Sequence, residues 1–316
     1  MQRLLGGLGL AFVLAAATPA GTAETPLVVS TAPAVVEQAP VLMARLKLYQ
    51  GPTLYVPGGI PALFGEGGVS QPADVATHAD TQALRNSVKH PDVRIIMTVT
   101  EGHYRIVARK SSGITRLSDL KGKKIGTLTA TSAAYHLNRM LAKAGLSEAD
   151  CTVIRVPIAD MPAALAKREI DALAIWEPEI SLAQKAIGAD AVVFKDDKAY
   201  RELFNLNTTE GRLKDPVKRA QIVRFVKAVM TAQQRLGRDR SQAYDMVVEQ
   251  TKHGREDVAA GMLNHSYPTR IPADLLDVLT AEEQWVAKDE KRAPRGRAEL
   301  AKLIDYSVIE EARALK

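Results

Sequence analysis

The stretch from Lys123 to Glu177 constrains the fold most, because a strand pattern leads directly into a helix pattern there. An apolar, strand-forming run ends at Leu128 and is followed by Thr129, Thr131 and Ser132, which are typical helix N-caps. Apolar residues then recur every three or four positions, which predicts a helix with one buried face: Ala133, Leu137, Met140, Leu141 and Ala144. The free N–H groups and the dipole of such a helix start suit an anion, although an ordinary capped helix has the same pattern.

The composition is that of a soluble globular protein, and it excludes some functions. The chain has 316 residues, enough for one large core or two small ones, with 46% hydrophobic and 25% charged residues. The formal charge is +6, but Lys and Arg are scattered among Asp and Glu, without basic runs interleaved with aromatic residues. We therefore expect no nucleic-acid partner. Cys151 is the only cysteine, so no intramolecular disulfide forms.

Residues 1–23 have the layout of a secretory signal peptide. Arg3 precedes an apolar run from Leu4 to Ala17, and small residues follow up to Ala23. We predict cleavage near Ala23, before Glu24, and export to the periplasm. An uncleaved anchor is the alternative. No cysteine lies near the cleavage point for a lipid anchor, and no later apolar stretch is long enough to span a membrane.

Strand and helix patterns alternate through the first two thirds of the chain, which predicts an α/β fold with mainly parallel sheets flanked by helices. Beyond Asp215 the patterns are helical only, which predicts a helical C-terminal tail. No linker separates the two α/β units, so we expect two lobes joined by crossing chain near 98–107 and 192–205. The strand patterns are at 27–31, 53–56, 74–77, 93–100, 104–109, 123–128, 152–156, 172–176 and 191–194.

Motifs for catalysis and metal binding are missing from the sequence. There is no Gly-x-Ser-x-Gly, no His-Glu-x-x-His, no phosphate-binding loop and no cysteine cluster. The six histidines do not have the spacing of metal ligands. We expect a protein that is not an enzyme and that needs no metal and no cofactor.

Several segments, in this order and spacing, resemble one family. They are Tyr55–Gly59, Asp74–Thr81, Ile106–Lys110, Leu117–Ile125, the helix ending Leu141–Leu146, Ala163–Leu165 and Asp171–Pro178. The resemblance is to the periplasmic solute-binding proteins of ABC importers for sulfonates, taurine and nitrate, whose superfamily includes thiamine-pyrimidine-binding proteins. It covers roughly residues 27–195, and the tail matches only in general character.

The resemblance implies a two-lobed, type II periplasmic binding fold that closes on a ligand by hinge motion. Residues 24–102 and 205–316 would form the first lobe, including the helical tail, and residues 103–204 the second. The partners would be a small-molecule ligand and an ABC permease in the inner membrane, and we expect a monomer. The superfamily also contains pyrimidine-synthesising enzymes, but these carry a Cys-rich stretch that this chain lacks.

Two groups of candidate ligand-binding residues come from the N-terminal part of this resemblance. Gly58 and Gly59 form a glycine turn at a strand end, where the backbone would approach a ligand, although a plain tight turn has the same sequence. His78, Asp80 and Thr81 follow the third strand, in a loop that faces the cleft in relatives. Asp80 would pair with a ligand amine or, alternatively, cap the helix that follows it.

The remaining candidates lie in the middle of the chain. Thr131, Ser132 and Ala133 belong to the helix start that would bind the anion. Trp176 would wall the pocket, while Glu177 would either face the ligand or cap the next helix. His103 and Tyr104, at the first crossover, would donate to an anion or pack in the hinge.

From these residues we expect an exported substrate-binding protein for a small anionic organic solute, such as a sulfonate. Two alternatives stay open. One is an exported enzyme on the same fold that acts on a pyrimidine-like or sulfonate substrate. The other is a ligand-sensing receptor module.

Overall fold

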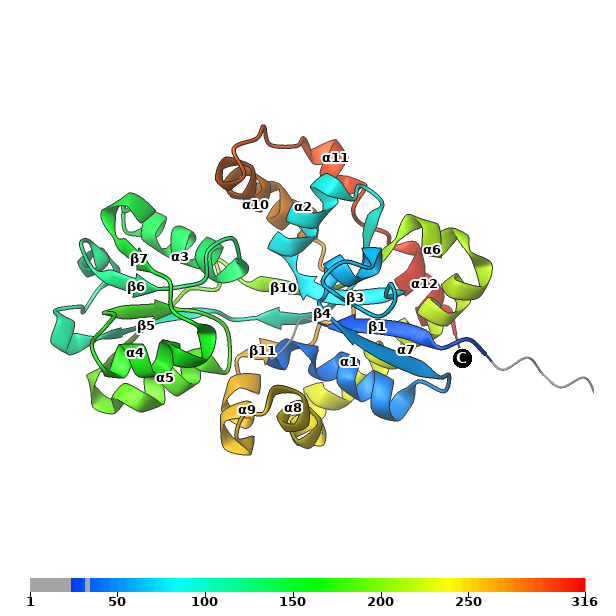
Figure 1. The fold of residues 1–316 in the computed structure, drawn as a ribbon, viewed down its shortest axis with the longest axis horizontal. Coiled ribbons are helices and arrows are strands. Elements are labelled where there is room, and N and C mark those ends of the chain that lie inside the picture. Colours follow the sequence, from blue (N-terminus) through cyan, green and yellow to red (C-terminus); the bar gives the residue numbers. More distant parts are fainter. Residues whose placement is uncertain (1–23, 32–34, 316) are drawn as a thin grey trace, which may run out of the picture.

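The computed structural model describes residues 24–31 and 35–315, and their strands form two separate sheets at opposite ends of the molecule (Figure 1). The predicted signal peptide lies outside these residues. In the described chain one sheet has six strands: β1 (Leu27–Thr31), β2 (Thr53–Pro57), β3 (Val75–Ala79), β4 (Val93–Gly102), β10 (Glu202–Thr209) and β11 (His265–Ser266). The other has five: β5 (Arg105–Arg109), β6 (Lys124–Gly126), β7 (Thr152–Ile154), β8 (Ala172–Ala174) and β9 (Ala191–Lys195).

Both sheets are mixed, so the predicted α/β class is confirmed but the expected parallel character holds only in part. In the first sheet, ordered β11-β4-β10-β3-β1-β2, β1 is parallel to β2 and β3, whereas β10 is antiparallel to β3 and β4. In the second, ordered β7-β6-β8-β5-β9, β6 is parallel to β7 and β8, whereas β5 is antiparallel to β8 and β9. The antiparallel pairs arise where the chain passes from one sheet to the other.

The chain connects the sheets through two strand-to-strand passages. β4 ends at Gly102 in the first sheet and β5 begins at Arg105 in the second. The return runs from β9 to β10, which inserts between β3 and β4 (Figure 1). The sequence patterns did not predict β10 as a strand. We call the six-stranded sheet with its helices the first lobe and the five-stranded sheet with its helices the second lobe.

The helices cover the sheets on both faces, and no helix in the described part of the chain is long and apolar enough to cross a membrane. The second lobe carries α3 (Ser132–Lys143), α4 (Met161–Ala166) and α5 (Glu179–Ile187). The first lobe carries α1 (Ala39–Met43), α2 (Asp80–Lys89), α6 (Glu210–Lys214), α7 (Pro216–Arg238), α8 (Tyr244–Thr251), α9 (Arg255–Met262), α10 (Leu275–Asp289), α11 (Arg297–Ala301) and α12 (Ser307–Ala314).

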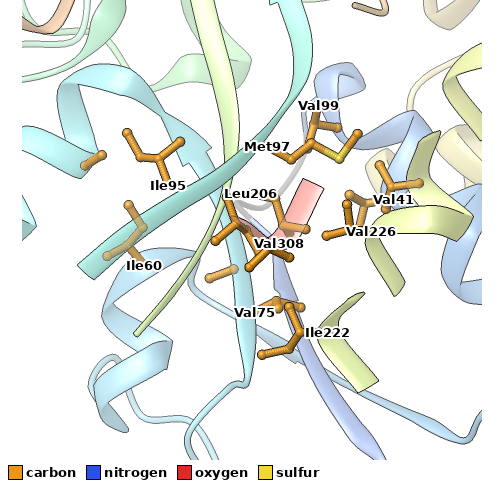
Figure 2. Packing of buried hydrophobic residues seen from close by; sticks show 14 of the residues in the cluster. Val41, Ile60, Val75, Ile95, Met97, Val99, Leu206, Ile222, Val226 and Val308 are labelled. Carbon is orange, nitrogen blue, oxygen red and sulfur yellow. The ribbon is translucent and has the colours of Figure 1, made fainter. Parts of the chain in front are cut away.

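The main core lies in the first lobe, where α7 packs on the sheet (Figure 2). Ile222, Phe225 and Val226 recur at helical spacing on the buried face of α7, opposite strand residues such as Val75 and Met97. Burying each such side chain contributes about 1.5–3 kcal/mol, so this face holds the lobe together. Smaller clusters fill both sides of the second sheet.

The tail confirms the helical prediction, with one break. The sequence pattern is helical throughout this part of the tail, but α11 ends at Ala301 and α12 begins at Ser307. Between them the Asp305 backbone N–H donates to the Ile95 carbonyl of β4 at 2.9 Å, and the Asp305 side chain accepts from the Ser307 N–H at 2.9 Å. A pairing with the sheet and a side-chain cap therefore divide the predicted helix.

Candidate functional site

A cavity of about 310 Å³ lies between the lobes, at the low end of the range for small-molecule sites. Both lobes and the strand that joins them supply its walls. The first lobe contributes Val35, Glu37, His78, Ala79 and Gln82, and the second contributes Tyr104, Leu128, Ala130, Thr131, Ser132, Ile158 and Trp176. Strand β10 adds Glu202 and Phe204.

The start of α3 faces this cavity. Thr131 is the N-cap, and its Oγ1 accepts from the Ala133 N–H at 3.2 Å. Ala130, just before it, has a φ of 61°, a left-handed conformation that is strained for a residue with a Cβ. The Ala130 carbonyl accepts from Gln82 Nε2 of α2 at 2.8 Å. The two lobes therefore touch directly beside the cavity.

Tyr104, Ser132 and Glu202 form a polar group on one wall. The Tyr104 hydroxyl donates to Glu202 Oε1 at 2.9 Å, and Ser132 Oγ donates to the same oxygen at 3.3 Å. Burial, with a smaller effect of the Glu37 charge, raises the pKa of Glu202 well above its ordinary value. A carboxyl group of the protein itself thus lies at the start of α3, where the sequence led us to expect a ligand's negative end.

His78 lines the opposite wall as a neutral imidazole. Its Nδ1 accepts from the Ala79 N–H at 3.1 Å, which places the proton on Nε2. Burial lowers the pKa of His78 to about 4. Gly59, with a φ of 69°, lies against this ring, since a Cβ there would fall 2.6 Å from His78 Cδ2. The glycine makes room for the histidine and does not itself line the cavity.

Glu37 is the second acid in the cavity wall, on the short 3₁₀ turn Val36–Gln38. Only 1% of the residue is exposed, and neither carboxylate oxygen accepts a hydrogen bond from the described residues. Its single charge contact is His265 Nε2, 3.3 Å from Oε1. This contact, together with the hydrogen bond that His265 Nδ1 makes to the Gly261 carbonyl, outweighs burial and raises the pKa of His265.

Trp176 lines the cavity, whereas Glu177 joins the lobes behind it. Trp176 packs against the apolar clusters of both lobes. Glu177 Oε1 lies 2.8 Å from Arg105 Nη2 and accepts from Asn264 Nδ2 at 2.9 Å. Burial raises the pKa of Glu177, and the charge of Arg105 opposes this rise. The structure places Glu177 in a hinge contact and not in the cavity wall.

Asp80 is fully buried and bonded within the protein, so it does not face a ligand amine. Its carboxylate accepts from the Leu203 N–H at 2.9 Å, from the Tyr200 hydroxyl at 3.0 Å and from the Thr81 N–H at 2.8 Å. Burial raises the pKa of Asp80 to about 6, although these hydrogen bonds oppose the rise. Asp80 and the neighbouring Thr81, also buried, hold the start of α2 against β10.

Three further predicted residues lie outside the cavity wall. Gly58 is in the turn after β2 and, like Gly59, is not among the lining residues. His103 lies in the passage between the sheets, where Nδ1 is 3.3 Å from Asp197 Oδ2 and the backbone N–H donates to the Asn264 carbonyl at 2.9 Å. Ala133 is buried within the core of the second lobe. A bulky residue at Ala133 would therefore disturb packing and would not block a ligand.

The structure brings together His78, Tyr104, Thr131, Ser132 and Trp176 from the sequence prediction. It adds four polar or aromatic residues that the sequence reasoning missed: Glu37, Gln82, Glu202 and Phe204. Glu202 and Phe204 were missed because β10 was not predicted as a strand. Glu37 gave no signal beyond being one acidic residue in a helical pattern. No group of three or more potential metal ligands occurs within residues 24–31 and 35–315.

Two sheets flanked by helices, with a cavity between the lobes, define a two-lobed, type II periplasmic binding fold. Comparison with known proteins gives the same fold. The periplasmic aliphatic sulphonate binding protein SsuA from Escherichia coli superposes with a TM-score of 0.69 at 16% identity, covering 89% of this chain and 92% of that one. The periplasmic nitrate-binding protein NrtA from Synechocystis PCC 6803 superposes with a TM-score of 0.69 at 14% identity, covering 92% of this chain and 89% of that one. The desulfurization enzyme DSZB shares the fold, with a TM-score of 0.62 at 13% identity, covering 90% of this chain and 99% of that one.

Sequence comparison gives the family. Residues 68–242 match the family described as NMT1/THI5 like. The chain belongs to this family. Proteins of Brucella abortus and Brucella melitensis named "Putative binding protein" are 40% identical over 76 residues. That match spans 24% of this chain and only 23% of the length of those relatives.

Proposed function

We propose that this protein is an exported substrate-binding protein that captures a small organic solute between its lobes and delivers it to an ABC importer. The observation that carries the proposal is the cavity itself. Both lobes line it with polar groups and with Trp176, and Gln82 of one lobe bonds to Ala130 of the other beside it. A site formed between two lobes suits a protein that closes on its ligand, because a partner can then distinguish the closed, ligand-bound form from the open form.

The wider setting follows from the family and from the sequence. The proposed division is 24–102 with 205–316 as one lobe and 103–204 as the other; the passages from β4 to β5 and from β9 to β10 support it, with β10 beginning already at Glu202. Export rests on the signal-peptide pattern of residues 1–23. The expected partner is an ABC permease in the inner membrane, and the protein would act as a monomer without metal or cofactor.

The test is native mass spectrometry of the protein purified from its own host without denaturation. We expect a bound small molecule of defined mass on the wild-type protein, and its loss in Trp176→Ala. The chain offers a matched control, because its other tryptophan, Trp285, lies outside this cavity. Trp285→Ala should keep the bound molecule. Equal occupancy in both variants would contradict the site, and an empty wild-type protein that binds no solute from a host extract would contradict the function.

An exported enzyme on the same fold is the second candidate, favoured by the shared fold of the desulfurization enzyme DSZB. The cavity also contains a carboxyl group with a strongly raised pKa, that of Glu202, bonded to a tyrosine hydroxyl. Perturbed carboxyl groups occur both at catalytic sites and in structural networks. Turnover of the co-purified molecule by the purified protein would favour the enzyme, and its unchanged recovery after incubation would favour binding.

A further inference from the structure

We propose that Glu37 and Glu202 together bind a positively charged, N–H-bearing group of the ligand, such as an amidinium or a protonated amine. This inference rests on the proposed function, because it names the chemical class of the solute held in the same cavity. It replaces the expectation of an anionic ligand that came from the sequence.

The first argument is the position and burial of the two carboxyl groups. Glu37 comes from the turn before α1 and Glu202 from the start of β10, so they reach the cavity from different parts of the chain. They are 1% and 3% exposed. Both line the same cavity, and the Glu37 charge adds to the burial that raises the pKa of Glu202. Two acids with so little access to water are stable only with hydrogen-bond donors or cations beside them.

The second argument is that the protein supplies only part of these partners. Glu202 Oε1 accepts from Tyr104 and Ser132, but Glu202 Oε2 and both oxygens of Glu37 accept no hydrogen bond from the described residues. His265 touches one side of Glu37. A buried carboxylate oxygen without a donor destabilises the folded protein. Ligand N–H groups would supply the missing donors.

The third argument is that the cavity has no group suited to neutralise an anion. No Lys or Arg is among the described residues that line it. His78 is neutral, since burial lowers its pKa to about 4. The start of α3 already faces Glu202 through Ser132. The chain as a whole is basic, yet this cavity is acidic.

The apolar walls restrict the rest of the ligand. Leu128, Trp176 and Phe204 line the same cavity, so a flat or apolar body would lie between them while its cationic end meets the acids. A volume of about 310 Å³ accommodates a single-ring compound. Benzamidine and benzoate are therefore matched probes, because they have nearly the same shape and opposite charge.

The test is calorimetric titration of ligand-free protein with benzamidine and with benzoate. We expect benzamidine to bind and benzoate not to bind at about 10 mM. Glu37→Gln and Glu202→Gln keep the side-chain shape but remove the charge, and each should weaken benzamidine binding about tenfold to a hundredfold. Glu310→Gln, an exposed acid on α12, is the control and should change nothing. Melting curves would check folding, and if one variant fails to fold the other still decides.

Binding should also depend on pH, because benzamidine stays protonated while Glu202 titrates. Burial raises the pKa of Glu202 well above its ordinary value, so the affinity should rise with pH as this carboxyl group ionises in the complex. Other titratable groups that act on Glu37 and Glu202, through their charge or a hydrogen bond, are Asp80, Glu177, Glu179, Tyr104, Tyr200, Tyr267, His265 and Glu282. The same titration with Glu202→Gln, in which the slope should be smaller, separates the contribution of Glu202 from theirs.

Three outcomes would overturn the inference: benzoate binding more tightly than benzamidine, no benzamidine binding at about 10 mM, or benzamidine binding that Glu37→Gln and Glu202→Gln leave unchanged. None of them bears on the proposed function, which is tested by the co-purified molecule and by its loss in Trp176→Ala. A co-purified molecule that is an anion would uphold the function and reject this ligand class.

Discussion

The two lobes each contain a helix that follows a strand, α2 after β3 and α3 after β6, and the two helix starts have different roles. In the second lobe, Thr131 and Ser132 at the start of α3 line the cavity. In the first lobe, α2 begins at Asp80, whose carboxylate accepts hydrogen bonds from Leu203, Tyr200 and Thr81. Both starts border the cavity, through Ala79 and Gln82 on α2 and through Thr131 and Ser132 on α3, but the Asp80 side chain is enclosed by the protein's own groups.

The difference shows that a polar side chain at a helix start can meet a ligand only where no other element encloses it. The sequence around both starts has short polar side chains that suit N-capping. What distinguishes them is β10, which pairs with β3 beside Asp80 and then presents Glu202 toward the start of α3. The covering strand is distant in sequence from both helices, so local patterns do not report it.

The largest effect should come from Asp80→Ala, which would break the closed helix start. The substitution leaves the Leu203 N–H and the Tyr200 hydroxyl without their acceptor, and we expect a loss of about 2–4 kcal/mol in the free energy of unfolding. Thr131→Ala, its counterpart on α3, should lose the cap and the hydrogen bond from Thr131 Oγ1 to the Leu128 carbonyl, or about 1–2 kcal/mol. Urea denaturation measures both. Equal losses would remove the contrast between the two helix starts.

A smaller effect should follow from Glu282→Gln, next to Asp80 on α10. Burial and then the Asp80 charge raise the pKa of Glu282 well above its ordinary value. The folded state therefore holds this proton to higher pH than the unfolded state, and wild-type stability falls as pH rises from the unfolded pKa through the folded one. Glutamine cannot ionise, so the stability gained by Glu282→Gln should grow with pH, reaching about 1–2 kcal/mol near pH 8.

Thermal melting at about pH 5 and pH 8 measures this difference. His78 and His136, whose pKa values are lowered by burial to about 4 and about 3, change stability in the opposite sense. They are present in both proteins and cancel in the comparison. A stability difference between variant and wild type that is the same at both pH values would show that Glu282 does not hold its proton in the folded protein.

Ser132→Ala tests the other helix start, at the beginning of α3. The variant loses the Oγ contacts to Glu202 and Tyr104 but keeps a residue that suits the first turn of a helix. We expect less than about 1 kcal/mol of lost stability and a roughly fivefold change in affinity for the co-purified molecule. Calorimetry and melting curves distinguish the two effects. A large drop in melting temperature without a change in affinity would assign Ser132 to structure alone.

The smallest effect should come from Gln82→Ala, which removes the bond between the two helix starts. Gln82 Nε2 donates to the Ala130 carbonyl across the lobes, and such a bond contributes about 0.5–1.5 kcal/mol. If it favours the closed form, its loss should weaken ligand affinity about threefold to tenfold and increase the fraction of open protein. X-ray scattering with and without ligand measures the opening. If the radius of gyration and the ligand affinity stay unchanged, Gln82 does not contribute to closure.

The sequence predicted most elements because their patterns are local. Leu27–Thr31 and the helix beginning near Ser132 fall almost where the periodicity placed them. β10 was missed because its polar residues Asn205 and Asn207 are buried and bonded inside the sheet, which resembles neither an alternating nor a wholly apolar strand.

The candidate site was predicted only where a local motif marks it. Thr131, Ser132 and Trp176 follow strand ends, and the prediction of His78 and Tyr104 came from the family resemblance. Glu37 and Glu202 depend on how the passages between the sheets bring distant segments together, which no spacing in the sequence encodes. The prediction of an anionic ligand came from the start of α3 and from the family resemblance, and it took neither residue into account.

A crystal structure of the protein with its co-purified molecule tests the central claim most directly. We predict ligand density in the inter-lobe cavity, against Trp176 and beside the Tyr104–Glu202 pair. Density confined to another hollow, such as the one lined by Asn138, Glu148 and Trp285, with the inter-lobe cavity holding only water, would contradict it.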